Sequence, residues 1–409
     1  MKILLINQTF YPDNVATSQY LTSLAKDLVA RDHQVSVLTG AHGYDNAGAA
    51  YSRYEEYEGI KIHRIRYSFF GKRSRLSRFI DFASFNSTLL FYLIFFKKQD
   101  VVIGLTSPPL VAAIGNLFCW LKGGRFLYWV MDMNPDEAIA AGWLKRDSLM
   151  GRFLTRISGW TFKKSNAIIA LDDFMKKKII ENYGIDEKKI TVIPPWAQDV
   201  HLRPIDHTHN SFRRAHKLEN KFVIMYSGNH SPCHPLETLL EAAYLLKDDP
   251  EVIFYFIGGG SRVDDVKKFK ETRMLKNIAQ LPYQPIDKIS ESLSAADLHV
   301  AIMGNDFVGI IHPCKVYNVL TVGRPFVFIG PEESHMGLLI KEGGVGYRIK
   351  HGDSNGLRGV IESVRNFSQE EKNMIFQKSI TLKDFAFSQK KLCGQLIELI
   401  ETGMIQFVR

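Results

Sequence analysis

The stretch GIIHPCKVYNVLTVGRP, residues 309–325, decides the fold of the second half of the chain. Its polar turn, residues 311–314, leads into a short helical pattern in which Val316 and Leu320 share one face. A glycine ends the pattern, and the apolar run that follows predicts a buried strand. Lys315 stands beside the predicted helix start, where free N–H groups and the helix dipole favour an anion. The stretch predicts a phosphate site, with an ordinary exposed lysine on a surface turn as the alternative.

Length and composition limit the class of protein. A chain of 409 residues is too long for one compact core and predicts two or three domains. The formal charge of +9, from 52 Lys and Arg against 43 Asp and Glu, allows nucleotides, nucleic acid or a membrane surface as partners. The basic residues are dispersed and lack interleaved aromatic motifs. We therefore expect no nucleic-acid binding.

Cysteine usage and the N-terminal sequence predict the compartment. The four cysteines form no C-x-x-C pair, which favours a reducing compartment. The start, MKILLINQTF, is expected to form a strand and no signal peptide. The longest apolar run, residues 89–96, is far shorter than the roughly 20 residues of a membrane-spanning helix. We expect a cytoplasmic protein.

Buried-strand and helical patterns alternate along both halves. Apolar runs at 3–6, 34–40 and 101–105 are each followed by a loop or helical pattern, which is typical of a doubly wound α/β sheet. Thr17 or Ser18 is the expected N-cap of the first helix. No G-x-G-x-x-G follows a strand in the first half, so nothing there favours a dinucleotide. Residues 44–58 are expected to form a loop, and the polar stretch after Pro195 a linker.

The segment from Lys72 to Lys98 allows two interpretations. Basic residues precede an aromatic and aliphatic run and two lysines close it, which is the composition of an interfacial membrane helix. The alternative is a core helix with solvated ends. We favour the core for residues 89–96 and a membrane contact for the arginine-rich approach.

Two carboxylates follow the strand at residues 125–130. Asp132 and Asp136 could bind an acceptor hydroxyl or take part in acid–base chemistry. Equally, Asp132 could cap the next turn, and Asp136 could stabilise the first turn of a helix. Function is favoured for Asp132, and both interpretations stay open for Asp136.

Glycine-rich loops follow the strands of the second half. Gly228 and Asn229 come directly after one strand, and the GGG turn at 258–260 follows the next. Such turns let backbone approach a phosphate closely. His230, Cys233 and His234, together with His312 and Cys314 on the other turn, could instead hold a soft divalent ion, but they lack the paired spacings of zinc motifs.

With these loops in view, nearly the whole chain resembles the retaining glycosyltransferases of family 4, in the group that builds bacterial exopolysaccharide and O-antigen. The most specific likeness is HPCKVYNVLTVGRP at residues 312–325. The other matching stretches are FYPDNVATSQYLTSLAKDL, TSPP, MDMNPDEAIAAGWL, VIPPW, YSGN, FIGGG and AADLHVAIM.

The resemblance implies the GT-B architecture, two Rossmann-like domains facing a central cleft. It implies an acceptor-binding domain at residues 1–200 and a nucleotide-sugar-binding domain at 201–385. A final helix at 386–409 is expected to cross back to the first domain.

The resemblance also implies roles for individual residues. Asp132 and Lys315 would be catalytic, with Lys315 neutralising the donor diphosphate. Thr17, Ser18 and Asp136 would serve the acceptor and phosphate loop. The donor would be bound by Gly228, Asn229, His230, Gly258, Gly259, Gly260, Tyr283, His312, Pro313, Cys314, Lys315, Tyr317 and Asn318.

The chain departs from the wider family at its paired glutamates. Asn318 takes the place of the second, and Gly309 or Ile310 that of the first. Lys315 would therefore carry more of the phosphate charge. A degenerate transferase that acts as a nucleotide-sugar-binding scaffold is one alternative. A nucleotide-sugar epimerase of the same architecture is another.

The expected reaction follows from charge. Breaking a sugar–phosphate bond leaves an anionic diphosphate and an oxocarbenium-like sugar, which positive charge at the phosphate stabilises. We expect front-face transfer with retention from a UDP-linked donor to a glycan or polyprenyl-diphosphate-linked acceptor. No D-x-D cluster is present, so no metal or other cofactor is expected. Peripheral contact with the anionic cytoplasmic face of the inner membrane is also expected.

Overall fold

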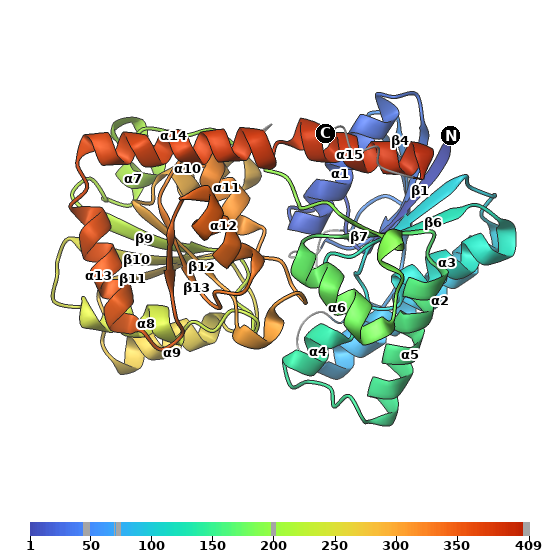
Figure 1. The fold of residues 1–409 in the computed structure, drawn as a ribbon, viewed down its shortest axis with the longest axis horizontal. Coiled ribbons are helices and arrows are strands. Elements are labelled where there is room, and N and C mark those ends of the chain that lie inside the picture. Colours follow the sequence, from blue (N-terminus) through green and yellow to red (C-terminus); the bar gives the residue numbers. More distant parts are fainter. Residues whose placement is uncertain (44–49, 69, 71–74, 198–201, 404–409) are drawn as a thin grey trace. The chain divides into compact units, whose positions relative to one another are not determined.

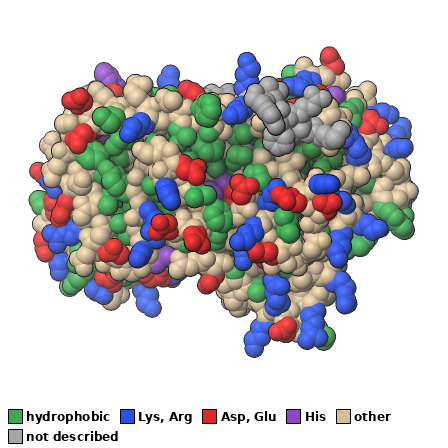
Figure 2. Space-filling model, viewed as in Figure 1, with side chains coloured by type: hydrophobic (Ala, Val, Ile, Leu, Met, Phe, Trp, Pro, Cys, Tyr) green, Lys and Arg blue, Asp and Glu red, His purple; other side chains and the backbone are tan. Residues whose placement is uncertain are grey.

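The computed structural model describes residues 1–43, 50–68, 70, 75–197 and 202–403. Contacts divide the chain into two compact units. Unit 1 comprises Met1–Pro195, Gly309–His312 and Leu392–Arg409, and unit 2 comprises Trp196–Val308 and Pro313–Lys391. Each unit is therefore assembled from segments far apart in the sequence. On the face drawn in Figure 2, Lys and Arg side chains are interspersed with acidic ones over both units.

Unit 1 is built on an eight-stranded sheet in the order β3-β4-β2-β1-β5-β6-β7-β8. Every neighbouring pair is parallel except β3 and β4. The residues of β5 and β7 are buried throughout, as expected for strands covered on both faces. The strands are β1 Lys2–Ile6, β2 Gln34–Gly40, β3 Tyr54–Tyr57, β4 Ile60–Ile65, β5 Val101–Gly104, β6 Arg125–Trp129, β7 Ala167–Ala170 and β8 Ile190–Val192.

Helices cover both faces of this sheet. α1 (Ala16–Val29) and α15 (Gln389–Thr402) lie on one face, and α2 (Arg75–Phe95), α3 (Val111–Lys122) and α5 (Leu149–Lys164) on the other (Figure 1). Glu401 of α15 pairs with Arg31 at 3.4 Å and with His33 at 2.9 Å. The remaining helices of unit 1 are α4 Asp136–Ala140, α6 Asp173–Tyr183 and η1 Glu187–Lys189.

Three expectations about unit 1 and the connection after it were wrong. Val15 is the N-cap of α1, and Thr17 and Ser18 lie inside the helix. Residues 54–57 form an edge strand because they pair antiparallel with β4. The expected linker is packed in its described part, because the N–H groups of Arg203 and Ile205 donate to serine hydroxyls of unit 2 at 3.1 and 3.0 Å.

α2 has an apolar face turned inward and another turned outward. Phe85, Leu89 and Leu93 are buried, as the core interpretation requires. Phe91 and Phe95 are exposed, the latter by 73%, together with Leu90, Tyr92 and Ile94. The arginine-rich approach favoured for a membrane contact lies largely outside the described residues. No helix in the described part of the chain is long and apolar enough to cross a bilayer.

Unit 2 is built on a six-stranded sheet in the order β11-β10-β9-β12-β13-β14. All neighbouring strands of this sheet are parallel. The chain order reverses beside β9, between β10 and β12, which is where ligands bind in sheets of this kind. The strands are β9 Phe222–Ser227, β10 Val252–Ile257, β11 Ile278–Leu281, β12 Leu298–Ile302, β13 Phe326–Ile329 and β14 Tyr347–Ile349.

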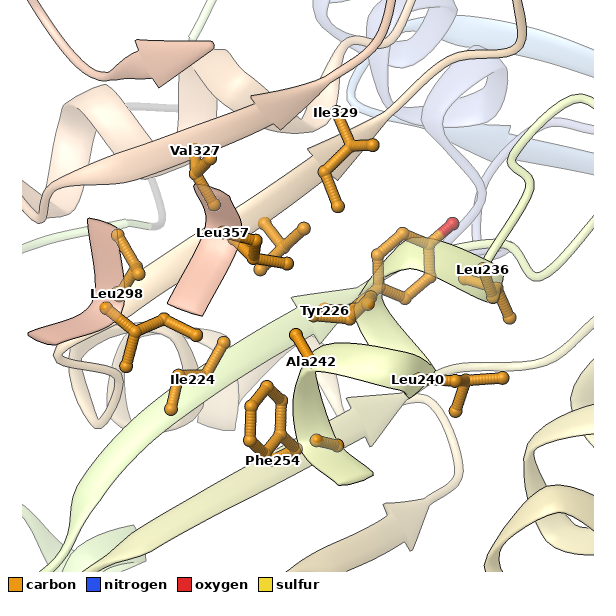
Figure 3. Packing of buried hydrophobic residues seen from close by; sticks show 14 of the residues in the cluster. Ile224, Tyr226, Leu236, Leu240, Ala242, Phe254, Leu298, Val327, Ile329 and Leu357 are labelled. Atoms are coloured by element: carbon orange, nitrogen blue, oxygen red, sulfur yellow. The ribbon is translucent and has the colours of Figure 1, made fainter. Parts of the chain in front are cut away.

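The larger hydrophobic core of unit 2 lies between this sheet and helices α8 and α13. Figure 3 shows Ile224, Phe254 and Leu298 from the strands together with Ala242 and Leu357 from these helices. The helices of unit 2 are η2 His207–His209, α7 Ser211–Ala215, α8 Glu237–Leu245, α9 Val263–Thr272, η3 Ile286–Lys288, α10 Ile289–Ser294, η4 Asn305–Phe307, α11 Lys315–Val322, α12 His335–Gly343, α13 Ser354–Arg365 and α14 Gln369–Ala386.

The stretch at residues 309–325 folds as predicted in its helix and strand. α11 begins at Lys315 and ends before Gly323, whose φ of 65° is left-handed. Val316 and Leu320 are buried. The segment before the helix divides, because Gly309–His312 belongs to unit 1 and Pro313 to unit 2.

Candidate active site

Three loops meet at the carboxyl ends of β9, β10 and β11. The N–H of Gly228 donates to Ile257 at 2.8 Å, and the N–H of Gly258 donates to Leu281 at 2.9 Å. The N–H of His230 donates to Gly259 at 2.7 Å. These bonds hold the turn after β9 directly against the GGG turn after β10.

Close packing of the two turns requires glycine. Gly228, Gly258 and Gly260 have φ values of 141°, 136° and 130°, a region that other residues rarely adopt. A Cβ at Gly260 would overlap the carbonyl oxygen of His230. A Cβ at Gly259 would lie 2.9 Å from the Tyr283 ring, which borders the turn. The glycines therefore allow the backbones of the two turns to lie in direct contact.

Lys315 enters this loop cluster from the start of α11. Its Nζ lies 3.8 Å from the centre of the Tyr226 ring. A Cβ at Gly228 would be 3.1 Å from the same nitrogen. The Nζ is buried and has no hydrogen-bond partner within the described ranges. Burial lowers the pKa of Lys315 to about 7.

His230 is a second buried group that lacks partners. Its side chain is 1% exposed, and neither ring nitrogen forms a hydrogen bond with any described residue. Burial, with Lys315 nearby, lowers the pKa of His230 to about 4. Buried polar groups are normally paired, so two orphaned groups at adjoining loops indicate a place for a ligand. The uncharged imidazole of His230 can donate a hydrogen bond, and Lys315 can carry a positive charge. Together they suit an anion whose oxygens accept hydrogen bonds.

The other residues at these loops are placed differently. His234 is held by the carbonyl of Ile302, 2.7 Å from its Nδ1, and burial lowers its pKa to about 3. The Tyr317 ring packs on Phe387, with centroids 4.5 Å apart. Cys314 is the N-cap residue of α11. Pro313 and Asn318 flank these positions in the sequence, and Asn229 receives a 2.7 Å hydrogen bond from the Tyr226 hydroxyl at its carbonyl.

Asp136 in unit 1 is engaged by protein groups. It is 3% exposed and accepts hydrogen bonds from Arg146 at 3.0 Å, from Asn182 at 2.9 Å and from the Tyr183 hydroxyl. Its first-turn position in α4 was one of the alternatives considered from the sequence. The carboxylate therefore holds α4, the loop that follows it and the end of α6 together.

Asp132 lies in the loop between β6 and α4. Burial, with Glu137 nearby, raises the pKa of Asp132 to about 8. A carboxyl group with this pKa is mostly protonated at neutral pH, so it can donate a hydrogen bond. A perturbed carboxyl near a strand's carboxyl end is a candidate for binding or proton transfer.

Two other predicted residues of unit 1 are held locally. The Thr17 hydroxyl lies 3.3 Å from that of Thr9, and Ser18 is buried within α1. His312 belongs to unit 1, where its Nδ1 lies 2.6 Å from a carboxylate oxygen of Asp172. Asp172 also caps α6 by accepting from the N–H of Met175. His312 is therefore fixed by unit 1, although the sequence associated it with Lys315.

Comparison with known proteins identifies a similar family. Residues 17–197 match the family model of Glycosyltransferase Family 4. The chain is therefore similar to Glycosyltransferase Family 4 over these residues. The resemblance inferred from the sequence motifs is confirmed, and the chain is assigned to the glycosyltransferases.

Curated relatives extend the similarity beyond the matched segment. The transferase is 26% identical over 351 residues to WcaI of Escherichia coli K12, which is assigned to colanic acid biosynthesis as a glycosyl transferase. That alignment covers 83% of this chain and 86% of WcaI. It is 24% identical over 268 residues to WbjE of Pseudomonas aeruginosa, assigned as a glycosyltransferase. There the alignment covers 66% of each protein.

Solved structures establish the fold of this chain. HepE of Anabaena, crystallised in complex with UDP and glucose, superposes with a TM-score of 0.74 at 15% identity. The match covers 98% of this chain and 100% of HepE. The GT-B fold predicted from the sequence is confirmed.

Sequence reasoning missed two features of the transferase. The cation–π contact between Lys315 and Tyr226 joins positions 89 residues apart, and Tyr226 gave no signal beyond its place in the YSGN stretch. The partners of Asp136 on α6 lie 46 and 47 residues further along the chain.

Proposed function

We propose that the chain is a retaining glycosyltransferase that moves a sugar from a UDP-sugar to a glycan or polyprenyl-diphosphate-linked acceptor in cell-surface polysaccharide biosynthesis. The observation that carries the donor site is the buried, unpartnered Nζ of Lys315 beside Gly228. A bound diphosphate would give this nitrogen a negatively charged hydrogen-bond partner. The complex of HepE with UDP and glucose supports UDP as the nucleotide part of the donor.

Leaving-group stabilisation is the main catalytic task proposed for unit 2. As the sugar–phosphate bond breaks, charge develops on the diphosphate, and the Lys315 ammonium next to the Gly228 turn stabilises it. The negative charge of the diphosphate also raises the pKa of Lys315. The side chain is therefore protonated when the donor is bound. The exposed Tyr283 ring beside Gly258 and Gly259 offers a surface on which the base can stack.

Retention follows from front-face transfer in this proposal. The leaving phosphate oxygen takes the proton of the acceptor hydroxyl as that hydroxyl attacks C1 from the same face. No carboxylate nucleophile is required. Asp132 binds the acceptor as a mostly neutral carboxyl at pH 7, consistent with its raised pKa.

The acceptor side of the proposal includes contact with the cytoplasmic face of the inner membrane. The end of α2 exposes Phe91, Ile94 and Phe95, and the end of α3 exposes Trp120 and Leu121. The ammonium of Lys122 joins these helix ends by donating to Ile94 and Phe96 carbonyls at 2.6 Å. Exposed aromatic residues of this kind suit the interface of a bilayer.

A nucleotide screen tests the donor site. Purified protein and its Lys315→Ala variant are heated with UDP, GDP, dTDP, ADP or NAD, and the melting temperature is recorded. We expect stabilisation by UDP that is lost in the variant, while Lys267→Ala, an exposed control, keeps it. A response to NAD alone, or to none of the nucleotides, would refute the donor site.

Product analysis tests the reaction class. With UDP-sugar and a polyprenyl-diphosphate-linked acceptor, we expect UDP release with formation of a new glycosidic bond of unchanged anomeric configuration by NMR. UDP release without a glycosylated product would favour hydrolysis or an epimerase. Binding without turnover on many acceptors would favour the scaffold.

A further inference from the structure

A basic hollow of about 600 Å³ lies on unit 1, lined by α5, by the loop before it and by the end of α6. Its cations are contributed by Arg146, Arg152, Arg156, Lys163 and Lys164, against one acidic lining residue, Asp147. In Figure 2, Lys and Arg side chains gather over this lower part of unit 1, where Figure 1 places α4 and α5. The hollow therefore has a strong excess of positive charge.

Buried contacts beneath the hollow give it a fixed shape. Asp136 holds Arg146 and Asn182, both of which line the hollow, and also the Tyr183 hydroxyl. The Oγ1 of Thr155, another lining residue, is buried and has no partner in the described part of the chain. These features make the hollow a prearranged recess with a free hydroxyl.

Four of the five cations are available to a ligand. Arg146 pairs with Asp136. The other four are exposed and form no ion pair within the residues described: Arg152, Arg156, Lys163 and Lys164. Unpaired guanidinium and ammonium groups converging on one recess match the oxygens of a phosphate.

Apolar side chains stand next to these cations on the first turns of α5. Leu149 is 88% exposed and Phe153 is 56% exposed, with Met150 between them also exposed. An ordinary solvated helix start does not place three large apolar groups in water. Beside a row of cations, they suit the boundary between lipid headgroups and acyl chains.

We propose that this hollow binds phosphate groups carried on anionic lipids, with Leu149 and Phe153 entering the hydrocarbon. The inference deepens the membrane contact proposed above and rests on it for the choice of an inner-membrane surface. It adds a headgroup site on α5 to the aromatic contact of α2 and α3. Free diphosphate shares the same chemistry, and the experiment separates the two sources.

Vesicle binding tests the site with no sugar donor present. The full chain is sedimented with vesicles of phosphatidylcholine, with or without 30 mol % phosphatidylglycerol, in 0.1 M NaCl. The variant Arg152→Ala/Arg156→Ala/Lys163→Ala removes three cations and spares Arg146. We expect it to weaken partitioning to the anionic vesicles by roughly 100-fold, because each of the three cations near such a surface contributes about fivefold.

A charge-matched variant serves as the control. Lys267→Ala/Lys268→Ala/Lys276→Ala removes three exposed cations from unit 2 and is expected to bind anionic vesicles like the unmodified chain. Equal loss in both triple variants would overturn the site, since net charge alone would then explain binding. So would equal binding by all three proteins.

Two further experiments complete the test. One distinguishes lipid phosphate from free diphosphate as the ligand, and the other distinguishes membrane binding from donor binding. Leu149→Ser/Phe153→Ser is expected to weaken vesicle binding at least tenfold. Met274→Ser/Phe385→Ser, which changes two exposed apolar residues of unit 2, is expected to leave it unchanged. Pyrophosphate that stabilises the unmodified chain but not the α5 triple variant, without any vesicle effect, would overturn the lipid assignment. The UDP-induced shift in melting temperature is expected to persist in the α5 triple variant, so a failed vesicle test leaves the donor site standing.

Discussion

The ammonium nitrogen of Lys315 lies 3.8 Å from the centre of the Tyr226 ring. Figure 3 shows Tyr226 at the edge of the unit 2 core with its hydroxyl turned away from Ala242 and Leu240. The ring stabilises a cation, yet it does not replace the hydrogen bonds that a buried ammonium loses. Lys315 therefore destabilises the empty fold and becomes fully paired only when an anion arrives.

Replacing Lys315 should thus change stability and binding in opposite directions. For Lys315→Met at pH 6, we expect the free energy of unfolding to rise by about 1–3 kcal/mol, because the buried charge is gone. UDP affinity should fall by about 100-fold, the loss typical of truncating one buried charge partner. Urea unfolding and calorimetry measure the two quantities. Lys267→Met is the control, and a stability loss with intact UDP binding would contradict the role of Lys315.

The pH dependence of UDP binding should report the same lysine. Its pKa is about 7 in the free protein, and a bound diphosphate raises it further. Above pH 7 the free site loses its proton before the complex does, so binding takes up a proton. UDP affinity should fall by up to about tenfold per pH unit from pH 7 upward.

Calorimetry at pH 8 in HEPES and in Tris, two buffers with different ionisation enthalpies, measures this proton uptake. We expect close to one proton per UDP in the unmodified chain and none in Lys315→Met. Equal values for the two proteins would rule out Lys315 as the group that titrates.

Asp132 should make stability depend on pH. Its pKa of about 8 lies above the ordinary value of 3.8. Between about pH 4 and pH 8 the folded chain holds a proton that the unfolded chain has lost. The contribution of Asp132 is therefore fully present below pH 4 and is lost as the pH rises through 8. We expect Asp132→Asn to gain stability relative to the unmodified chain from pH 5 to pH 9, measured by urea midpoints. A constant difference would show that Asp132 is ionised throughout.

Asp136 should be mainly a stabilising residue. Its replacement by alanine leaves Arg146, Asn182 and Tyr183 without their shared acceptor, and we expect a loss of about 3–5 kcal/mol in the free energy of unfolding. Asp147→Ala, at an exposed position eleven residues later, should change stability by less than about 0.5 kcal/mol. Chemical denaturation compares the two, and a small effect of Asp136→Ala would return that carboxylate to the acceptor candidates.

Turnover should not require a divalent metal. Lys315 and the glycine turns supply the charge stabilisation that a metal would provide. We expect the initial rate of UDP release to be unchanged within about twofold in 5 mM EDTA. Loss of activity that Mg²⁺ or Mn²⁺ restores would refute this prediction.

The fold could be predicted because its signals are local. Apolar runs of four to six residues that lead to a turn and a helical pattern are present at several central strands, among them β1, β5 and β10. Gly228 and the GGG turn were recognisable because glycine directly after a strand has few other uses.

The remaining features depend on contacts that local patterns do not encode. Hydropathy predicts that α2 is apolar but does not say that Leu89 is covered while Phe91 is exposed. The hollow on α5 arises from cations spread over residues 146–164, whose convergence requires α5 and α6 to be folded. Likewise, His312 and Lys315 are three residues apart, yet the chain passes from unit 1 to unit 2 between them.

The discontinuity of unit 1 has a consequence for how the chain is made. Leu392, Leu396 and Ile400 of α15 are buried, and the Ile400 carbonyl accepts a 2.6 Å hydrogen bond from Arg125. These residues leave the ribosome after all of unit 2 has been synthesised. The sheet of unit 1 is therefore covered by α15 only after residues 392–402 have been synthesised. The sheet of unit 1 comes first in the sequence, yet it gains this covering helix only after the strands of unit 2 have been made.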